Sequence, residues 1–164
     1  MMKDRNKGFS YVEMIIVLAI MGVMVALLSI TVGTVNRNNA LRASEQLESY
    51  VNNARANALT KGTTRGVLSI AKDSTGVYAY VGEKQYTVDN VKNKGDKVCN
   101  GKVEVTVNGV AGALMYIEFK QSTGGLTDGM IVSNPLGVDY VEVKTKNGNT
   151  TSSFKVYTMG KVVR

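Results

Sequence analysis

The sequence predicts an α+β protein in which one long N-terminal helix packs against a mainly antiparallel β-sheet or a small sandwich. Three observations lead to this fold class. An uncharged apolar run fills residues 14–35, an apolar stripe with helical spacing continues to about residue 61, and short β-rich runs separated by turn residues fill the remainder. The length of 164 residues suits one globular domain with an appendage.

The amino-acid composition narrows the possible chemistry. The chain contains no histidine and no tryptophan, and its single cysteine, Cys99, cannot form an intramolecular disulfide. Catalysis by histidine and imidazole-bound metal centres are therefore excluded, and CxxC motifs are absent. We expect a non-enzymatic protein with a structural or binding role, holding neither a cofactor nor a metal.

The first apolar segment, Met14–Val35, contains no charge, no proline and no amide side chain. As a helix its 22 residues would span about 33 Å, which is enough to cross the hydrocarbon core of a bilayer. The segment is too long for a secretory signal peptide. Its hydrophobicity on all faces argues against a buried core helix in so small a domain. The segment is therefore predicted to be a transmembrane helix.

An amphipathic pattern follows without a break signal. Lys61 suits the last turn of a helix, and Gly62 can serve as its left-handed cap. We therefore predict one continuous helix from Phe9 to about Lys61, whose second half packs on the residues that follow. The apolar residues that recur at steps of three and four are Ala40, Ala43, Leu47, Tyr50, Val51, Ala54 and Ala58.

The rest of the chain has the pattern of β-strands. In the stretch 102–107, Val103, Val105 and Val107 alternate with polar residues, which predicts one buried face. Turn signals, among them Asn108-Gly109, separate the apolar runs. The predicted strands are Val67–Ile70, Val77–Val81, Tyr86–Val88, Lys102–Val107, Leu114–Phe119, Met130–Val132, Tyr140–Lys144 and Phe154–Met159.

One acidic residue, Glu13, stands directly before the apolar run, within the sequence Lys7-Gly8-Phe9-Ser10-Tyr11-Val12-Glu13. Placing a carboxylate inside a membrane costs roughly 2.5 to 3.5 kcal/mol at mid-membrane and less near the interface. Such a residue is by default a candidate for function. The alternative is an interfacial glutamate whose side chain reaches the lipid headgroups.

This N-terminus resembles type IV prepilins and the pseudopilins of type II secretion and competence systems. The resemblance consists of a short basic leader ending in Gly8, then Phe9, then a glutamate at the fifth mature position, then the apolar helix. It implies that prepilin peptidase cuts between Gly8 and Phe9 and that the new amino group of Phe9 is methylated. It also implies that Glu13 directs assembly by pairing with the Phe9 amine of a neighbouring subunit.

The resemblance further implies a pilin-like fold, a domain division and a location. Residues 1–8 would form the leader, 9–35 the transmembrane and filament-core half of the helix, 36–62 the amphipathic half, and 63–164 the β-rich globular domain. The subunit would sit in the cytoplasmic (inner) membrane as a single-pass protein with its globular domain outside, and then in an extracellular pilus or pseudopilus. Its partners would be other pilin subunits, prepilin peptidase and an assembly platform protein.

Two details bear on the kind of subunit. Many major pilins have proline where this chain has Ile30, which favours a minor pilin or pseudopilin. The rest of the chain loosely resembles the GspH/FimT group of minor pseudopilins. The residues that carry this second resemblance are Tyr50–Ala58, Ile117-Glu118-Phe119 with Gly124-Gly125, and Phe154-Lys155-Val156 with Gly160-Lys161-Val162-Val163.

The net charge of +7 permits a second function, DNA binding by a competence pseudopilin. Candidate phosphate-binding residues are the cluster Lys92, Lys94 and Lys97 and the tail residues Lys161 and Arg164. The tail is similar to a basic end found in DNA-binding FimT-like pilins. The alternative for the cluster is a solvated loop. A third possibility for the whole chain is an anchored surface protein that is never cleaved.

Overall fold

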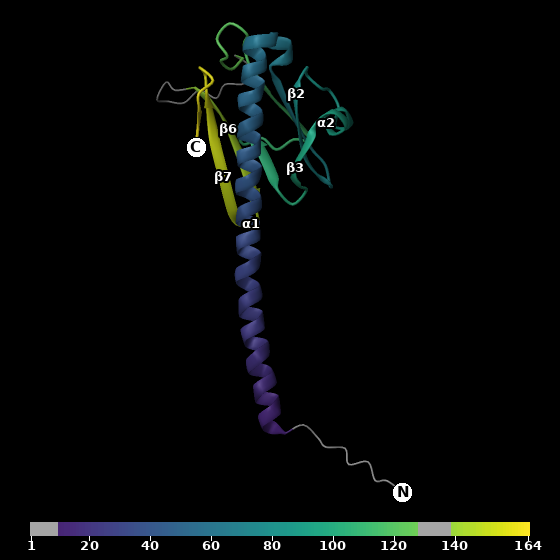
Figure 1. The fold of residues 1–164 in the computed structure, drawn as a ribbon, viewed down its shortest axis with the longest axis vertical. Coiled ribbons are helices and arrows are strands. Elements are labelled where there is room, and N and C mark those ends of the chain that lie inside the picture. Colours follow the sequence, from purple (N-terminus) through teal and green to yellow (C-terminus); the bar gives the residue numbers. More distant parts are fainter. Residues whose placement is uncertain (1–9, 128–138) are drawn as a thin grey trace. The chain divides into compact units, whose positions relative to one another are not determined.

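The computed structural model describes residues 10–127 and 139–164, without the side chains of residues 28–32. Its longest element is α1, Tyr11–Lys61, drawn in purple and blue in Figure 1. The chain divides into two compact units, Met1–Val35 and Asn36–Arg164, so that the first part of α1 belongs to one unit and the second part to the other.

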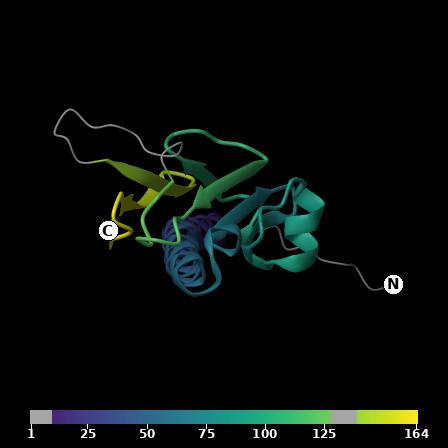
Figure 2. The same ribbon diagram turned by 90° about the horizontal axis from the view of Figure 1, so that it is seen from above.

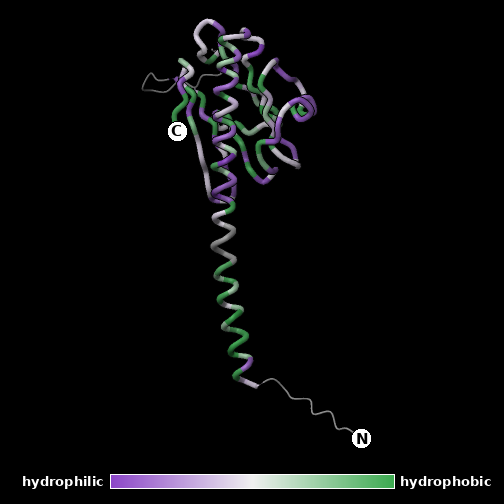
Figure 3. Tube along the Cα trace, in the orientation of Figure 1, coloured by the Kyte–Doolittle hydropathy of each residue, from purple (hydrophilic) through white to green (hydrophobic). Residues whose placement is uncertain are grey.

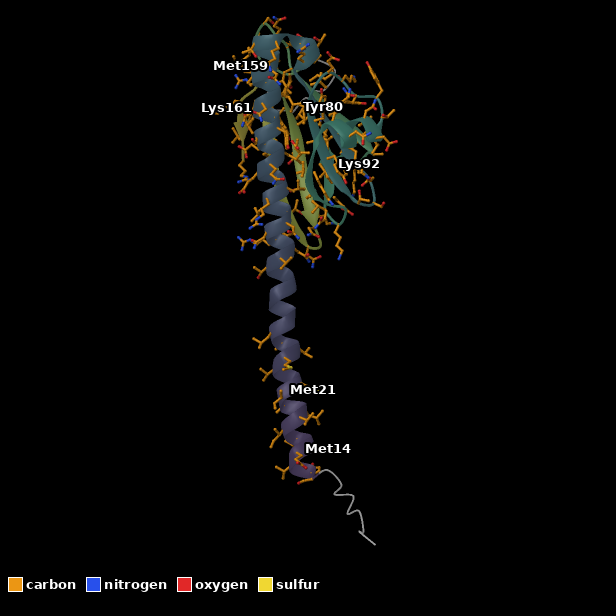
Figure 4. All side chains as sticks on the ribbon, turned by 45° about the vertical axis from the view of Figure 1, so that its right-hand side comes forward. Met14, Met21, Tyr80, Lys92, Met159 and Lys161 are labelled. Atoms are coloured by element: carbon orange, nitrogen blue, oxygen red, sulfur yellow. The ribbon has the colours of Figure 1, made fainter. Side chains whose placement is uncertain are left out.

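In the first unit, α1 carries apolar side chains on all its faces. Every described side chain from Tyr11 to Leu27 is exposed, including Met14 and Met21, which are labelled in Figure 4. Figure 3 shows the same stretch as mostly hydrophobic. Within the described residues, no helix reaches the combination of length and hydropathy needed for a membrane span.

In the second unit, α1 buries the predicted apolar stripe. Its alanines have no side chain beyond Cβ, so they let the neighbouring sheets approach the helix closely. The helix ends at Lys61, where the Gly62 amide donates to the Ala58 carbonyl and Gly62 has φ 100°. The buried members of this face are Ala40, Ala43, Ser44, Leu47, Val51, Ala54 and Ala58.

Two four-stranded antiparallel sheets complete this unit. Sheet A has the strand order β3-β2-β1-β5, and sheet B has the order β4-β6-β7-β8. The α+β class with a long helix on antiparallel sheets is therefore confirmed (Figure 2). The strands are β1 Val67–Lys72, β2 Gly76–Gly82, β3 Asp96–Asn100, β4 Glu104–Val107, β5 Leu114–Glu118, β6 Tyr140–Asn147, β7 Thr150–Tyr157 and β8 Val162–Val163.

One hydrophobic core joins the second part of α1 to both sheets. Leu47 of α1, Ile117 of sheet A and Phe154 of sheet B all belong to the same buried cluster, and each is at most 1% exposed. Burying one such side chain stabilises the fold by about 1.5–3 kcal/mol. The alternating valines 103, 105 and 107 are all buried, as the sequence pattern predicts.

The prediction of a strand at Tyr86–Val88 is wrong. The helix α2, Val88–Lys94, begins there, because the Thr87 hydroxyl caps it by accepting a hydrogen bond from the Asn90 amide. A local side-chain cap therefore outweighs the β propensity of Tyr, Thr and Val. A short 3-10 helix, Thr63–Arg65, follows α1.

The alternative prediction, that the lysine cluster forms a solvated loop, is also wrong, because Lys92 and Lys94 lie on α2 and Lys97 lies on β3. Strands β3 and β8 are not predicted by the sequence pattern. The predicted strand Met130–Val132 lies outside the described residues.

Candidate assembly site and basic residues

Glu13 lies in the first turn of α1 and caps it. Its Oε2 accepts a hydrogen bond from the Ser10 amide at 2.9 Å, and the Ser10 hydroxyl accepts one from the Val12 amide at 3.3 Å. The two side chains thus satisfy two backbone amides that the helix itself leaves without partners. The side chain also stands at the positive end of the helix dipole.

Ser10 is a residue that the reasoning from sequence missed. The signal was present, because Ser-x-x-Glu before an apolar run is the spacing of a capping box. The predicted processing residues Gly8 and Phe9 lie outside the described residues. The site that the structure describes therefore consists of Ser10 and Glu13 at the start of an exposed apolar helix.

The long helix begins with a capped acidic turn, continues as an exposed apolar surface and packs in its second part on antiparallel sheets, which is consistent with a pilin-like fold. A family model described as "Prokaryotic N-terminal methylation motif" matches residues 3–29. The chain thus carries the signature of type IV prepilin-like proteins. A search of curated proteins and a search of solved structures each gave no match.

Two of the three lysines of the predicted DNA-binding cluster already have partners within the fold. Lys92 Nζ contacts Asp73 Oδ2 at 2.7 Å and Thr75 Oγ1 at 3.2 Å. This contact holds the pKa of the Asp73 carboxyl well below its usual range. Lys94 Nζ donates to Gln85 Oε1 at 3.2 Å. Lys97, on β3, is exposed.

The basic tail lies elsewhere on the globular unit. The Arg164 guanidinium contacts Glu45 Oε1 at 3.2 Å and Glu48 Oε2 at 4.0 Å, so that two carboxylates of α1 face it. Lys161 is exposed and lies well away from Lys92 in Figure 4. The structure therefore does not bring the five predicted cations together on one surface.

Arg55 has a structural role that the sequence did not reveal. Its Nε donates to the Gly124 carbonyl at 3.1 Å, and its Nη2 donates to the Met159 carbonyl at 3.3 Å. These bonds tie α1 to two loops that are distant in sequence. They give a physical reason for an arginine at this position of α1.

Two other polar groups stand out in the globular unit. Burial raises the pKa of the Cys99 thiol to about 11, so the thiol is protonated and weakly nucleophilic at neutral pH. Tyr50 is partly buried, and its hydroxyl donates a hydrogen bond to Asp96 at 2.9 Å. Both effects raise the pKa of Tyr50 to about 12. Within the described residues, no group of three or more Cys, Asp or Glu side chains is placed to hold a metal ion.

Proposed function

We propose that this chain is a non-enzymatic structural subunit, a minor pilin or pseudopilin, of a type IV pilus or a type II secretion-like filament. Prepilin peptidase removes residues 1–8 by cutting between Gly8 and Phe9, and the amine of Phe9 is then methylated. The observation that carries the proposal is the methylation motif at residues 3–29, which contains Gly8, Phe9 and Glu13 in register. Ile30, in place of the proline of many major pilins, supports a minor subunit.

Before assembly, the apolar segment 14–35 holds the subunit in the cytoplasmic membrane with its globular unit outside. The absence of charge from this segment and the exposure of its described side chains on every face of α1 support this step. An assembly platform protein then transfers the subunit to the filament. There, neighbouring subunits replace lipid around the same surface.

Within the filament, Glu13 receives the positively charged Phe9 amine of a neighbouring subunit. The capping geometry is compatible with this role, because the Ser10 amide contacts Oε2 and a carboxylate can accept further donors through its other oxygen. Pairing compensates the cost of burying the charge, whereas an unpaired carboxylate in an apolar core is costly. The pair therefore fixes the axial position of the incoming subunit.

Two measurements test the proposal. The intact mass of the membrane-extracted protein should correspond to the chain without residues 1–8 plus one methyl group. An intact leader would identify an uncleaved anchored protein. In addition, Glu13→Gln should keep the capping bond to Ser10 and the processing, but lose incorporation into filaments.

Glu13→Asp serves as the matched control, because it keeps the charge while shortening the side chain. It should retain more incorporation than Glu13→Gln. Filaments that contain Glu13→Gln subunits at the normal yield would contradict the assigned role of Glu13.

The alternative function is that of a competence pseudopilin that binds DNA. Its support is the net charge of +7 and the exposed Lys97 and Lys161. Binding through phosphate contacts requires a steep loss of affinity with salt. Neutralising Lys161 and Arg164 together should then reduce that salt dependence. Absence of DNA binding at low salt would exclude this function.

A further inference from the structure

A polar groove runs between α1 and one side of sheet A. We use the name groove for three neighbouring hollows of about 290, 360 and 300 Å³. The first lies between the helix and β3, the second beside Lys94–Asp96 and the middle of β2, and the third beside the end of β2. The second and third share Asn57, Tyr80 and Val81, so they are continuous. Figure 4 labels Tyr80 on this side of the sheet.

The groove follows the open edge of the sheet and not one of its faces. Four consecutive residues of β3, Lys97–Asn100, line the first hollow, whereas successive side chains of a strand point to opposite faces. Only a hollow at the strand's edge can contact all four. β3 is the end strand of sheet A, and no residue of β2 lines this hollow, so the edge is the unpaired one.

The same open edge continues along β2. Pairing between β2 and β3 ends at Ala79 and Asp96. Beyond that point, Tyr80 to Glu83 are four consecutive residues that line the third hollow. Along both strands the groove therefore borders backbone amides and carbonyls on a side where the sheet has no neighbouring strand.

The opposite wall is a polar stripe of α1. Its residues recur at steps of three and four, and the stripe carries amides and cations where the neighbouring face of the helix carries buried alanines. The stripe consists of Asn39, Arg42, Gln46, Tyr50, Asn53, Asn57 and Lys61. Cations outnumber carboxylates around the groove: Arg42, Lys61, Arg65, Lys94 and Lys97 stand against Glu83 and Asp96.

We propose that this groove binds an extended acidic peptide segment of another protein, which adds as a strand to the open edge of sheet A. Peptide backbone suits the edge, because a strand edge alternates donors and acceptors, and only another peptide backbone offers the complementary alternation. A nucleic-acid phosphate backbone offers acceptors alone and would leave the edge carbonyls facing like groups. The cations Arg42 and Lys97 face the acidic side chains.

One contact crosses the groove, the exposed hydrogen bond between Tyr50 and Asp96. The Asp96 carboxylate stands in the path of an acidic ligand and repels it. Removing that charge while keeping the side-chain shape should therefore strengthen binding. Removing the Asp96 charge is thus expected to raise the affinity for the peptide, whereas reversing a cation is expected to lower it. None of these substitutions involves Glu13, so the proposal is independent of filament assembly.

The test uses the full mature chain in detergent micelles and a fluorescein-labelled peptide of alternating Thr and Glu. Fluorescence anisotropy should show saturable binding, with little binding of the matching Thr-Lys peptide. Arg42→Glu and Lys97→Glu should each weaken binding by about fivefold, since each turns a surface attraction into a repulsion. Asp96→Asn should tighten binding, by about threefold, because one repulsion is removed.

A matched control and a backbone readout make the test specific to strand addition. Lys146→Glu reverses an exposed lysine of sheet B and should leave the affinity unchanged. On peptide binding, hydrogen exchange should slow in the segments 80–82 and 96–100. Unchanged thermal unfolding of each variant confirms that its fold is intact.

Three results would overturn the proposal. The first is the absence of saturable binding of the acidic peptide. The second is binding without slower exchange in either segment, which would indicate attraction by charge alone. The third is protection of these segments by a single-stranded thymidine oligonucleotide and not by the peptide, which would assign the groove to nucleic acid.

Discussion

Gly160 and Gly109 form a matched pair that tests the contact between Arg55 and the Gly124 carbonyl. Both have a left-handed backbone, with φ 79° and φ 77° respectively, so replacement by alanine costs each about 1–2 kcal/mol in backbone conformation. Their surroundings differ. A Cβ at Gly160 would lie 2.2 Å from the Gly124 carbonyl oxygen and 2.5 Å from Arg55 Nε, whereas a Cβ at Gly109 meets nothing within 4 Å.

The difference between the two substitutions follows from the hydrogen bond that must break. In Gly160→Ala, either the Arg55 guanidinium or the Gly124 carbonyl has to move, and the 3.1 Å bond between them is lost. A hydrogen bond to a charged group contributes about 1.5–3 kcal/mol. We therefore expect Gly160→Ala to lower the free energy of unfolding by about 2.5–5 kcal/mol, and Gly109→Ala by about 1–2 kcal/mol.

Urea unfolding of the mature chain in micelles, followed by tyrosine fluorescence, measures both values. Arg55→Ala on its own should lower the free energy of unfolding by about 2 kcal/mol, because it removes one half-buried and one exposed hydrogen bond from the guanidinium to backbone carbonyls. Equal costs for Gly160→Ala and Gly109→Ala would refute the reasoning, since the two glycines would then differ in nothing that affects stability.

Three further predictions concern the globular unit. Thr87→Ala should destabilise α2 by about 1 kcal/mol, seen as faster hydrogen exchange at Val91, while Thr87→Ser should preserve the cap. Lys92 holds the pKa of the Asp73 carboxyl below its unfolded value. The contribution of this ion pair to folding stability is therefore complete at neutral pH and is lost on acidification below pH 3.8. Asp73→Asn should accordingly reduce the acid dependence of urea unfolding. The pKa of Tyr50 is raised to about 12. Its stabilisation is therefore complete below pH 10.0 and is lost as the pH rises from 10.0 toward 12, and Tyr50→Phe should remove a tyrosinate absorbance step near pH 12.

Periodic patterns made much of the fold predictable. The alanines and leucine of the helical stripe are all fully buried, and the helix ends at Lys61 as the sequence predicts. The turn at Asn108-Gly109 also forms as expected, with both residues at positive φ between the paired Val107 and Val110. These features depend on residues close together in sequence, where spacing and side-chain shape decide the conformation.

The parts that could not be predicted depend on distant residues or on a competing local contact. Arg55 binds carbonyls 69 and 104 residues away, and no sequence pattern marks a backbone acceptor. Glu13 was recognisable because its motif is contiguous in sequence, whereas the capping role of Ser10 was missed. The partners of the lysine cluster were also not predictable, because Lys92 lies on α2, where it pairs with Asp73, whereas Lys97 lies on β3.

The first unit shows why such a helix needs other molecules around it. Thirteen large apolar side chains between Tyr11 and Leu27 are 45–80% exposed. Full burial of this set would be worth roughly 20–40 kcal/mol, more than the net stability of a typical domain. Burial in lipid or among neighbouring helices supplies this energy without fixing any axial position, because apolar contact is not directional. Glu13 is the one charged residue between Ser10 and Val35, and in the proposed function its pairing with a neighbouring Phe9 amine supplies that directional contact. Glu13→Gln should therefore leave membrane extraction unchanged and affect only incorporation into filaments.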